Sequence, residues 1–283
     1  MPTAIDIAIV TGAVWLAGLW LLLLLFAIPA TRANARELFG LMLPEGLILA
    51  VAAVTFIAGP IAAMLALALT GFRVGWESGK VAGLPEWPTA AVGAALVGIG
   101  ALITWPPSVL IAVFIIPIAV LLHDKPAARL ALFPGVPLLL MGSLVTEPDS
   151  LAFMLMAFLL VEIFDCFALL GGRLFGEIRL IPTISPSKTV EGLLMGVLLT
   201  LLAASGLSVW FGLESMGWVI ACLAVPPLAF LGDLLGSVIK RKAGVKDYPA
   251  ILPQGGLLDI LDAWLVTAPV FTIIMLAATG LAA

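Results

Sequence analysis

The chain has 283 residues, of which 63% are hydrophobic and only 11% are charged, and its formal net charge is −4. Soluble globular domains carry roughly a quarter of charged residues, so the composition excludes a soluble domain and predicts an all-α integral membrane protein. The acidic balance gives no sign of a nucleic-acid-binding surface. Cys166 and Cys222 lie in apolar stretches without the spacing of a zinc site or a disulfide framework.

Nine apolar stretches follow one another along the chain, and each is predicted to span the membrane because a span needs about 20 mostly apolar residues. They cover residues 7–30, 46–70, 88–104, 108–122, 129–145, 151–170, 192–212, 217–235 and 257–280. Pro106 and Pro107 separate the third and fourth stretches, which indicates a tight helical hairpin or, alternatively, one broken segment. A single membrane domain, residues 1–283, is the simplest organisation.

The positive charges between the stretches predict an orientation. Of the 13 lysines and arginines, 11 lie in loops that follow an even-numbered stretch, and the exceptions are Arg32 and Arg36. Because positively charged loops stay in the cytoplasm, we expect a cytoplasmic N-terminus and a C-terminus outside, in a bacterial inner membrane. The two long even loops, residues 171–191 and 236–256, would then present a cytosol-facing site to a soluble substrate.

Five acidic residues fall in or beside the predicted spans, where an ionised side chain costs several kcal/mol unless it is paired, hydrated or bound to metal. They are Glu162, Asp165, Asp233, Asp259 and Asp262. A spacing of three places Glu162 with Asp165, and Asp259 with Asp262, on one helix face. A divalent cation such as Mg²⁺, which prefers hard oxygen ligands, would relieve the repulsion. Helix caps and salt bridges to loop lysines are the alternatives.

The segment before the last stretch has the features of a phosphate site. Gly255 and Gly256 would let backbone N–H groups approach a phosphate at a helix N-terminus, although any loop-to-helix junction has this form. Lys240, Arg241 and Lys246 add cations suited to a triphosphate. A basic run of this kind also marks the cytosolic edge of a membrane protein.

A second polar segment, residues 185–192, reads SPSKTVEG at a predicted helix start. Thr189 and Glu191 could cap that helix, while Lys188 would face the aqueous mouth of the site. Capping alone is a sufficient explanation for Glu191.

The stretch from residue 237 to residue 262 resembles the signature of phosphatidate cytidylyltransferases, also called CDP-diacylglycerol synthases. The matching positions are Ser237, Lys240, Arg241, Lys246, Asp247, Pro253, Gly255, Gly256, Asp259 and Asp262. Gly232-Asp233, DCFALLGGRLFG at residues 165–176 and SPSKTVEG at residues 185–192 are also similar to family blocks. Gln254 and Ile260 stand where the family has histidine and arginine, so the chain resembles a diverged member.

The resemblance covers roughly residues 150–275, which makes residues 151–283 a catalytic-type half and residues 1–150 a set of spans of weak resemblance. It implies a magnesium-dependent enzyme of phospholipid biosynthesis that transfers CMP from CTP to a lipid phosphate, phosphatidate, and releases pyrophosphate. The partners would be CTP, the lipid phosphate and membrane lipids, with a homodimer left open and no nucleic acid.

The resemblance also implies roles for individual residues. Catalysis would involve Asp259, Asp262, Lys240 and Lys246. More than one divalent cation would be held by Asp165, Asp233, Asp259 and Asp262. Substrate contacts would come from Ser185, Lys188, Thr189, Glu191, Ser237, Arg241, Gln254, Gly255 and Gly256.

Three other functions fit parts of the pattern. Glutamine cannot carry a proton near neutral pH, and the loss of the arginine removes a bidentate donor. These two departures at Gln254 and Ile260 would suit a paralogue acting on another lipid or polyprenyl phosphate, or a catalytically silent relative. Intramembrane carboxylates would also suit a cation-coupled transporter.

Overall fold

The computed structural model describes the whole chain except residues 29–31, 104, 123, 252–254 and 281–283. It also leaves out the side chains of some helix residues within the first 121 residues. The helices are α1 (Ala4–Ala27), α2 (Arg32–Ile57), α3 (Pro60–Ala82), α4 (Glu86–Ile103), α5 (Pro107–Leu121), α6 (Pro126–Leu130), the π-helical turn η1 (Ala131–Gly135), α7 (Val136–Leu144), α8 (Ser150–Phe175), α9 (Val190–Phe211), α10 (Met216–Lys242) and α11 (Leu257–Thr279).

The all-α membrane class is confirmed, with one small addition. Two short antiparallel strands, β1 (Arg179–Ile181) and β2 (Ser185–Thr189), form a hairpin between α8 and α9. Among the described residues, 6 helices are long and apolar enough to cross a bilayer. They are Glu86–Ile103, Pro126–Leu144, Ser150–Phe175, Val190–Phe211, Met216–Lys242 and Leu257–Thr279. The count of nine spans is therefore not confirmed.

The predicted second span, residues 46–70, is wrong, because the structure divides it between α2 and α3. Gly59 has a φ of 103°, a conformation that glycine adopts readily, and Pro60 follows as the first residue of α3. Proline suits this first helical position because its missing N–H would have no partner there. As a consequence α3 extends to Ala82 and takes Arg73 and Glu77 into a helix, where the sequence predicted a loop.

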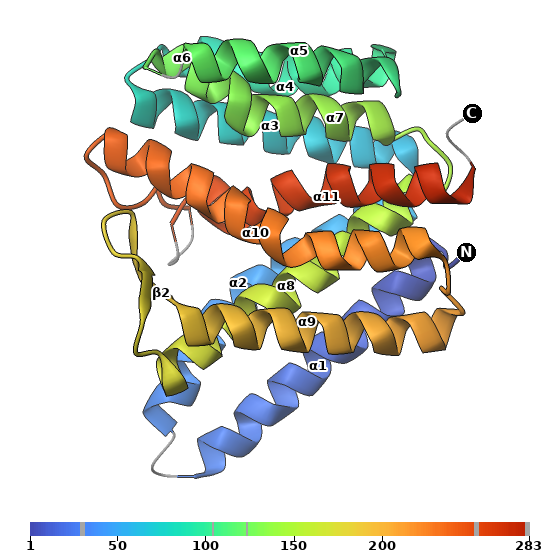
Figure 1. The fold of residues 1–283 in the computed structure, drawn as a ribbon, viewed down its shortest axis with the longest axis vertical. Coiled ribbons are helices and arrows are strands. Elements are labelled where there is room, and N and C mark those ends of the chain that lie inside the picture. The colour runs from blue at the N-terminus through green and yellow to red at the C-terminus, as the bar shows by residue number, and fades with distance from the viewer. Residues whose placement is uncertain (29–31, 104, 123, 252–254, 281–283) are drawn as a thin grey trace.

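This extra helix changes where the chain ends lie. Figure 1 shows the start of α1 and the end of α11 at one end of the molecule, and the hairpin and the end of α10 at the opposite end. The sequence predicted the two termini on opposite sides, because it counted α2 and α3 as one crossing. The start of α2, which carries Arg32 and Arg36, lies at the hairpin end. The two arginines that disagreed with the predicted charge pattern thus join the other basic loops.

The helices α8, α10 and α11, which lead to or from the hairpin end, share one apolar core. Every residue of α8 from Ala152 to Val161 is buried, and Trp264 of α11 packs on it, with Nε1 donating to the Met154 carbonyl at 3.1 Å. A Cβ at Gly232 of α10 would collide with the α11 backbone at Asp262 and Ala263. Glycine is needed here because it permits this close approach, which brings the polar ends of α10 and α11 together.

Candidate active site

Polar residues from four elements meet at the hairpin end of the molecule. Lys188 of β2 forms an ion pair with Asp233 of α10, and the Ser237 hydroxyl donates to Asp233 Oδ1 at 3.4 Å, one helical turn away. The Lys188 and Asp233 side chains keep 20% and 29% of their surface exposed. Lys188 Nζ also lies 5.2 Å from the centre of the Phe230 ring. The pair is therefore enclosed on one side and open on another.

Two further carboxylates act on the same lysine. Burial would lower the pKa of Lys188, but the Asp233 charge, followed by the charges of Asp165 and Asp262, raises it above its ordinary value. Asp165 comes from α8, and Asp262, which is only 6% exposed, comes from α11, where its Oδ1 accepts from the Ala263 N–H at 2.7 Å. We call Lys188 and its three aspartates the Lys188 centre.

The Lys188 centre has the donor chemistry of a magnesium site. Carboxylate oxygens are the hard ligands that Mg²⁺ prefers. Within the part of the chain that the structure describes, no three histidine, cysteine, aspartate or glutamate side chains gather closely enough to hold one ion. Mg²⁺ commonly takes only one or two protein carboxylates and completes its octahedron with water and substrate phosphates. The carboxylates of Asp233, Asp262 and Asp165 therefore have the donor chemistry of a metal site shared with a substrate, and not the arrangement of a closed protein cage.

A second ion pair lies deeper, between Lys240 of α10 and Asp259 of α11. Lys240 Nζ is 2.5 Å from Asp259 Oδ1, and the two side chains are only 10% and 7% exposed. Asp259 Oδ2 accepts from the backbone N–H groups of Tyr248 at 2.8 Å and Gly256 at 2.9 Å. Both carboxylate oxygens are thus engaged by the protein. We call this pair and its two backbone donors the Asp259 anchor.

The anchor fixes the connection between α10 and α11. Lys240 Nζ lies 5.3 Å from the centre of the Tyr248 ring, and the Ile251 N–H donates to the Gly255 carbonyl at 2.9 Å. Gly255 has a φ of 133°, which side chains of L-residues rarely tolerate. The glycine turn predicted as a phosphate site is therefore held in shape by a carboxylate.

The N-terminal half also holds this turn, through two residues that sequence analysis did not select. Glu77 of α3 is 0% exposed and accepts from the N–H groups of Leu257 at 2.9 Å and Leu258 at 2.8 Å, at the start of α11. Arg73, one turn earlier, donates to Glu77 Oε1 at 2.7 Å and to the Pro249 carbonyl at 3.0 Å. Their spacing of four, typical of a helical ion pair, was the available signal.

Two other predicted substrate residues, Thr189 and Glu191, bond to the backbone close to them in the chain. Thr189 caps α9, as predicted, because its hydroxyl accepts from the Gly192 N–H at 3.1 Å. Glu191 accepts from the Glu177 N–H at 3.1 Å and from the Ile178 N–H, which ties α9 to the start of the hairpin.

Arg241 is exposed and donates through Nε to the Ile184 carbonyl at 3.2 Å and through Nη1 to the Val245 carbonyl at 2.8 Å. It therefore joins the hairpin to the segment after α10. Lys246 is exposed, Ser185 is 9% exposed, and Gln254 lies outside the described residues.

Comparison with known proteins identifies the family to which the chain belongs. Residues 2–278 match the model of the cytidylyltransferase family. A 134-residue segment is 37% identical to a phosphatidate cytidylyltransferase of Staphylococcus epidermidis, over 46% of this chain and 52% of the relative. Over the same shares, identity is 36% to the Staphylococcus saprophyticus protein of that name and 34% to the Staphylococcus aureus protein. The chain spans about half the length of these relatives. The family model, in contrast, spans nearly the whole chain, so the chain belongs to the cytidylyltransferase family.

Proposed function

We propose that the chain transfers CMP from CTP to a lipid phosphate, with phosphatidate as the acceptor and CDP-diacylglycerol as the product. The observation that carries the proposal is the Lys188 centre, where Lys188 pairs with Asp233 and the charges of Asp165 and Asp262 act on the same lysine, in a member of the cytidylyltransferase family. The name of the staphylococcal relatives supports phosphatidate as the acceptor.

In the proposed reaction an oxygen of the lipid phosphate attacks the α-phosphorus of CTP. The bond from that phosphorus to the oxygen shared with the β-phosphate breaks, and pyrophosphate leaves with both electrons of the bond. The attacking oxygen of a phosphate monoester is already ionised near neutral pH, so no general base is required. The protein then has two tasks, which are to align the two polyanionic substrates and to stabilise the charge that grows on pyrophosphate.

Lys188 is the residue best placed for the second task. Its raised pKa keeps it charged, and its partial exposure leaves it able to exchange Asp233 for a phosphate oxygen. Because a lysine ammonium has three donors on a flexible stem, it can follow a leaving group over a short distance. Lys240 is less free, since Asp259 and the Tyr248 ring enclose it, so we assign it to holding the turn.

The carboxylates suit divalent cations, and we propose Mg²⁺, in more than one ion, as the cofactor. Such ions would supply positive charge to the phosphate groups of CTP and to the leaving pyrophosphate. Asp233 and Asp262 are the proposed principal ligands, with Asp165 as a third. Asp259 is not among the proposed ligands, because the protein already occupies both of its oxygens.

The hairpin end is the end that we propose faces the cytosol, where CTP is found. The basic connections gather at this end, and positively charged connections stay in the cytoplasm. Both termini would then lie outside, in contrast to the cytoplasmic N-terminus that the sequence predicted.

A substrate panel tests the proposed function. Purified protein in detergent would be given CTP, Mg²⁺ and one acceptor, and pyrophosphate release would be measured with phosphatidate, a polyprenyl phosphate and diacylglycerol. We expect release with phosphatidate and none with diacylglycerol, which lacks the attacking oxygen. Because Ile260 replaces the family arginine, faster release with the polyprenyl phosphate would identify an altered acceptor. No release with any phosphate would overturn the proposal.

A further inference from the structure

The chain has one tyrosine, Tyr248, and its hydroxyl group is buried. Tyr248 lies in the connection between α10 and α11 and is 1% exposed. Its hydroxyl oxygen has no hydrogen-bond partner among the residues that the structure describes. Buried polar groups in proteins are nearly always hydrogen-bonded, because a hydroxyl that leaves water without a partner raises the free energy of the folded state. The Tyr248 hydroxyl is therefore a candidate for a contact that forms during function.

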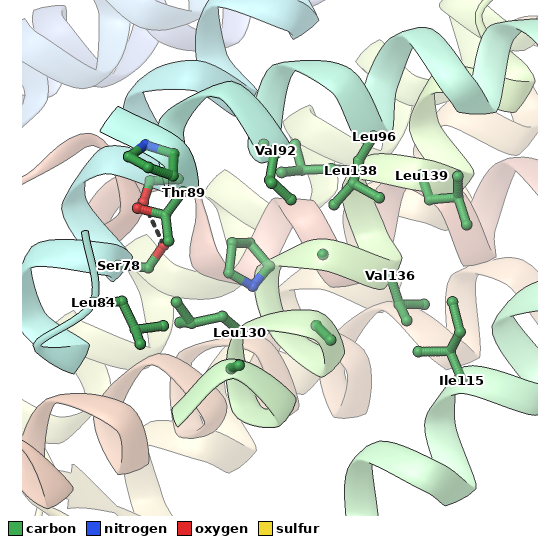
Figure 2. A pocket seen from close by; sticks show the side chains of 17 residues that line it. Ser78, Leu84, Thr89, Val92, Leu96, Ile115, Leu130, Val136, Leu138 and Leu139 are labelled. Carbon is green, nitrogen blue, oxygen red and sulfur yellow. Dashed lines mark hydrogen bonds between the residues drawn. The ribbon is translucent and has the colours of Figure 1, made fainter. Parts of the chain in front are cut away.

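Two cavities in the described part of the chain do not supply that contact. Figure 2 shows the larger one, of about 320 Å³, whose walls are mainly apolar side chains such as Val92, Leu96 and Leu138. Tyr248 lines neither this cavity nor a smaller one of about 70 Å³ beside Lys242. The polar groups that surround Tyr248 remain as the source of a partner.

Contacts with three helices fix the place of Tyr248. Its backbone N–H donates to Asp259 Oδ2 of α11 at 2.8 Å, and Lys240 Nζ of α10 lies 5.3 Å from the centre of its ring. A Cβ added to Gly256 would lie 2.8 Å from the Tyr248 Cβ and 2.6 Å from Glu77 Oε2 of α3. Tyr248 therefore lies where α3, α10 and α11 meet, with its hydroxyl group shielded from solvent.

Asp262 of the Lys188 centre lies about one helical turn from this place. It follows Asp259 by three residues on α11, and a Cβ added to Gly236 would lie 2.8 Å from its Oδ2. Gly236 precedes Lys240 by four residues on α10. Both helices thus place Asp262 one turn, about 5.4 Å, beyond the Lys240–Asp259 pair, on the side away from the connection. A tyrosine side chain that starts beside that pair is long enough to reach this level.

The electrostatics of Tyr248 agree with this geometry. Burial raises the pKa of Tyr248 above its ordinary value, and three carboxylates raise it further. The largest effect among the three comes from Asp262, ahead of Asp259 and Glu77. The phenol consequently stays protonated at neutral pH and can donate its O–H to a carboxylate oxygen.

We propose that the Tyr248 hydroxyl donates to the Asp262 carboxylate and orients it for metal binding, so that Tyr248 is a positioning residue of the Lys188 centre. The two groups are not bonded in the structure, so the bond would form when Asp262 moves to bind an ion. Loss of a hydrogen bond to a ligating group commonly lowers metal affinity roughly 10- to 100-fold. This inference rests on the proposed function for the role of Asp262 as a metal ligand.

A spectroscopic test follows Tyr248 by itself, because the chain has no second tyrosine. Protein made with 3-fluorotyrosine would give one ¹⁹F resonance in detergent, recorded with CTP and without a lipid acceptor while Mg²⁺ is added. We expect the resonance to shift as Mg²⁺ binds, because the hydroxyl then gains its partner. A resonance that stays in place, while the same protein binds Mn²⁺ by electron paramagnetic resonance, would overturn the inference.

Tyr248→Phe and Thr272→Val form a matched pair of variants. Each removes a buried hydroxyl that has no partner among the described residues, and Thr272 is 0% exposed. Thr272 lies ten residues beyond Asp262 on α11, about 15 Å along the helix axis. We expect Tyr248→Phe to weaken Mn²⁺ binding in the presence of CTP about tenfold, and Thr272→Val to leave it unchanged. Without metal, neither variant should lower the unfolding temperature, because each loses an unpaired hydroxyl.

The dependence of turnover on Mg²⁺ gives a second reading. In Tyr248→Phe the Mg²⁺ concentration for half-maximal rate should rise about tenfold, whereas kcat at saturating Mg²⁺ should fall much less, since only the orientation of a ligand is lost. Equal metal affinity in Tyr248→Phe and wild type would overturn the inference. An equal loss of metal affinity in Tyr248→Phe and Thr272→Val would overturn it as well.

The outcomes also separate this inference from the proposed function. Weaker Mn²⁺ binding in Tyr248→Phe, in a protein that transfers CMP to no lipid phosphate, would leave the positioning role standing and overturn the reaction. Normal CMP transfer with unchanged metal affinity in Tyr248→Phe would leave the reaction standing and overturn the positioning role.

Discussion

The two lysine–aspartate pairs at the hairpin end differ in what the protein has left for a substrate. In the Asp259 anchor, a lysine and two backbone N–H groups engage both carboxylate oxygens, and the side chains are about 10% exposed or less. In the Lys188 centre, the Lys188–Asp233 pair is 20% and 29% exposed, and two more carboxylates act on the same lysine. We therefore expect the two pairs to serve different purposes, one as a fixed support of the turn and the other as a centre that exchanges partners.

This difference teaches that an intramembrane carboxylate is not by itself a metal ligand. A buried ion pair with every oxygen bonded stabilises one conformation, and removing one partner leaves an uncompensated charge. In a partly exposed pair with an excess of negative charge, the lysine can instead bind a phosphate, or the carboxylates can bind a cation. Stability and activity should therefore respond separately to changes in the two regions.

The largest effect on turnover is expected at the Lys188 centre. Asp262→Asn and Asp233→Asn, tested singly, should lower kcat about a thousandfold, because a neutral amide supports neither a metal ion nor the charge of the leaving group. Thermal unfolding in detergent should stay close to wild type, since the amide keeps the volume of the side chain. Near-normal kcat in both variants would remove the Lys188 centre from the reaction.

Asp259→Asn should affect stability as well as turnover. Lys240 would lose its partner while almost fully buried, at a cost of about 3 kcal/mol in the free energy of unfolding. Adding Lys240→Met should restore part of that loss, because the unpaired charge is then gone, while turnover stays low. Full stability of the single variant would contradict the anchor and return Asp259 to the candidate metal ligands.

Glu77→Gln tests whether the N-terminal half holds the reaction turn. The amide has one acceptor oxygen for the two N–H groups of Leu257 and Leu258, and it loses the charge that pairs with Arg73. We expect a loss of about 2 kcal/mol in stability. Hydrogen exchange should become faster at the start of α11 and unchanged in α9. Equal exchange in both helices would mean that α3 does not hold this turn.

The smallest effect is expected at Arg241, where two functions make opposite predictions. If its guanidinium joins the hairpin to the segment after α10, Arg241→Lys should lower turnover a few-fold, because an ammonium cannot bond both carbonyl groups. If it binds phosphate by charge alone, lysine should replace it without loss. The turnover of Arg241→Gln should fall well below that of Arg241→Lys only if the positive charge alone matters.

Much of the C-terminal half could be predicted from sequence because its chemistry is local. Lys240, Asp259, Gly255 and Gly256 lie within one motif. Thr189 caps α9, the helix that begins at the next residue, as predicted. The pairing within the motif could not be predicted. A sequence names the charged residues, but only the close approach of α10 to α11 at Gly232 decides which carboxylate faces which lysine.

The N-terminal half was harder to predict because apolar composition alone does not mark where one helix ends and the next begins. Residues 46–70 satisfied the hydropathy criterion of a span, although Gly59 and Pro60 divide them. Because the prediction missed that division, it ended the span at residue 70 and left Arg73 and Glu77 in a loop, where a charged pair needs no explanation. Their role depends on contacts with residues about 180 positions later in the chain, and no local pattern encodes those contacts.

The central claim, that the site transfers CMP to a lipid phosphate, is tested most directly with position-labelled CTP. Purified protein would be incubated with phosphatidate, Mg²⁺ and CTP labelled at either the α- or the γ-phosphate, and the lipid extract would be counted. We predict label in the lipid from α-labelled CTP only, and its loss in Asp262→Asn. Label from γ-labelled CTP, or no label from either, would contradict the account.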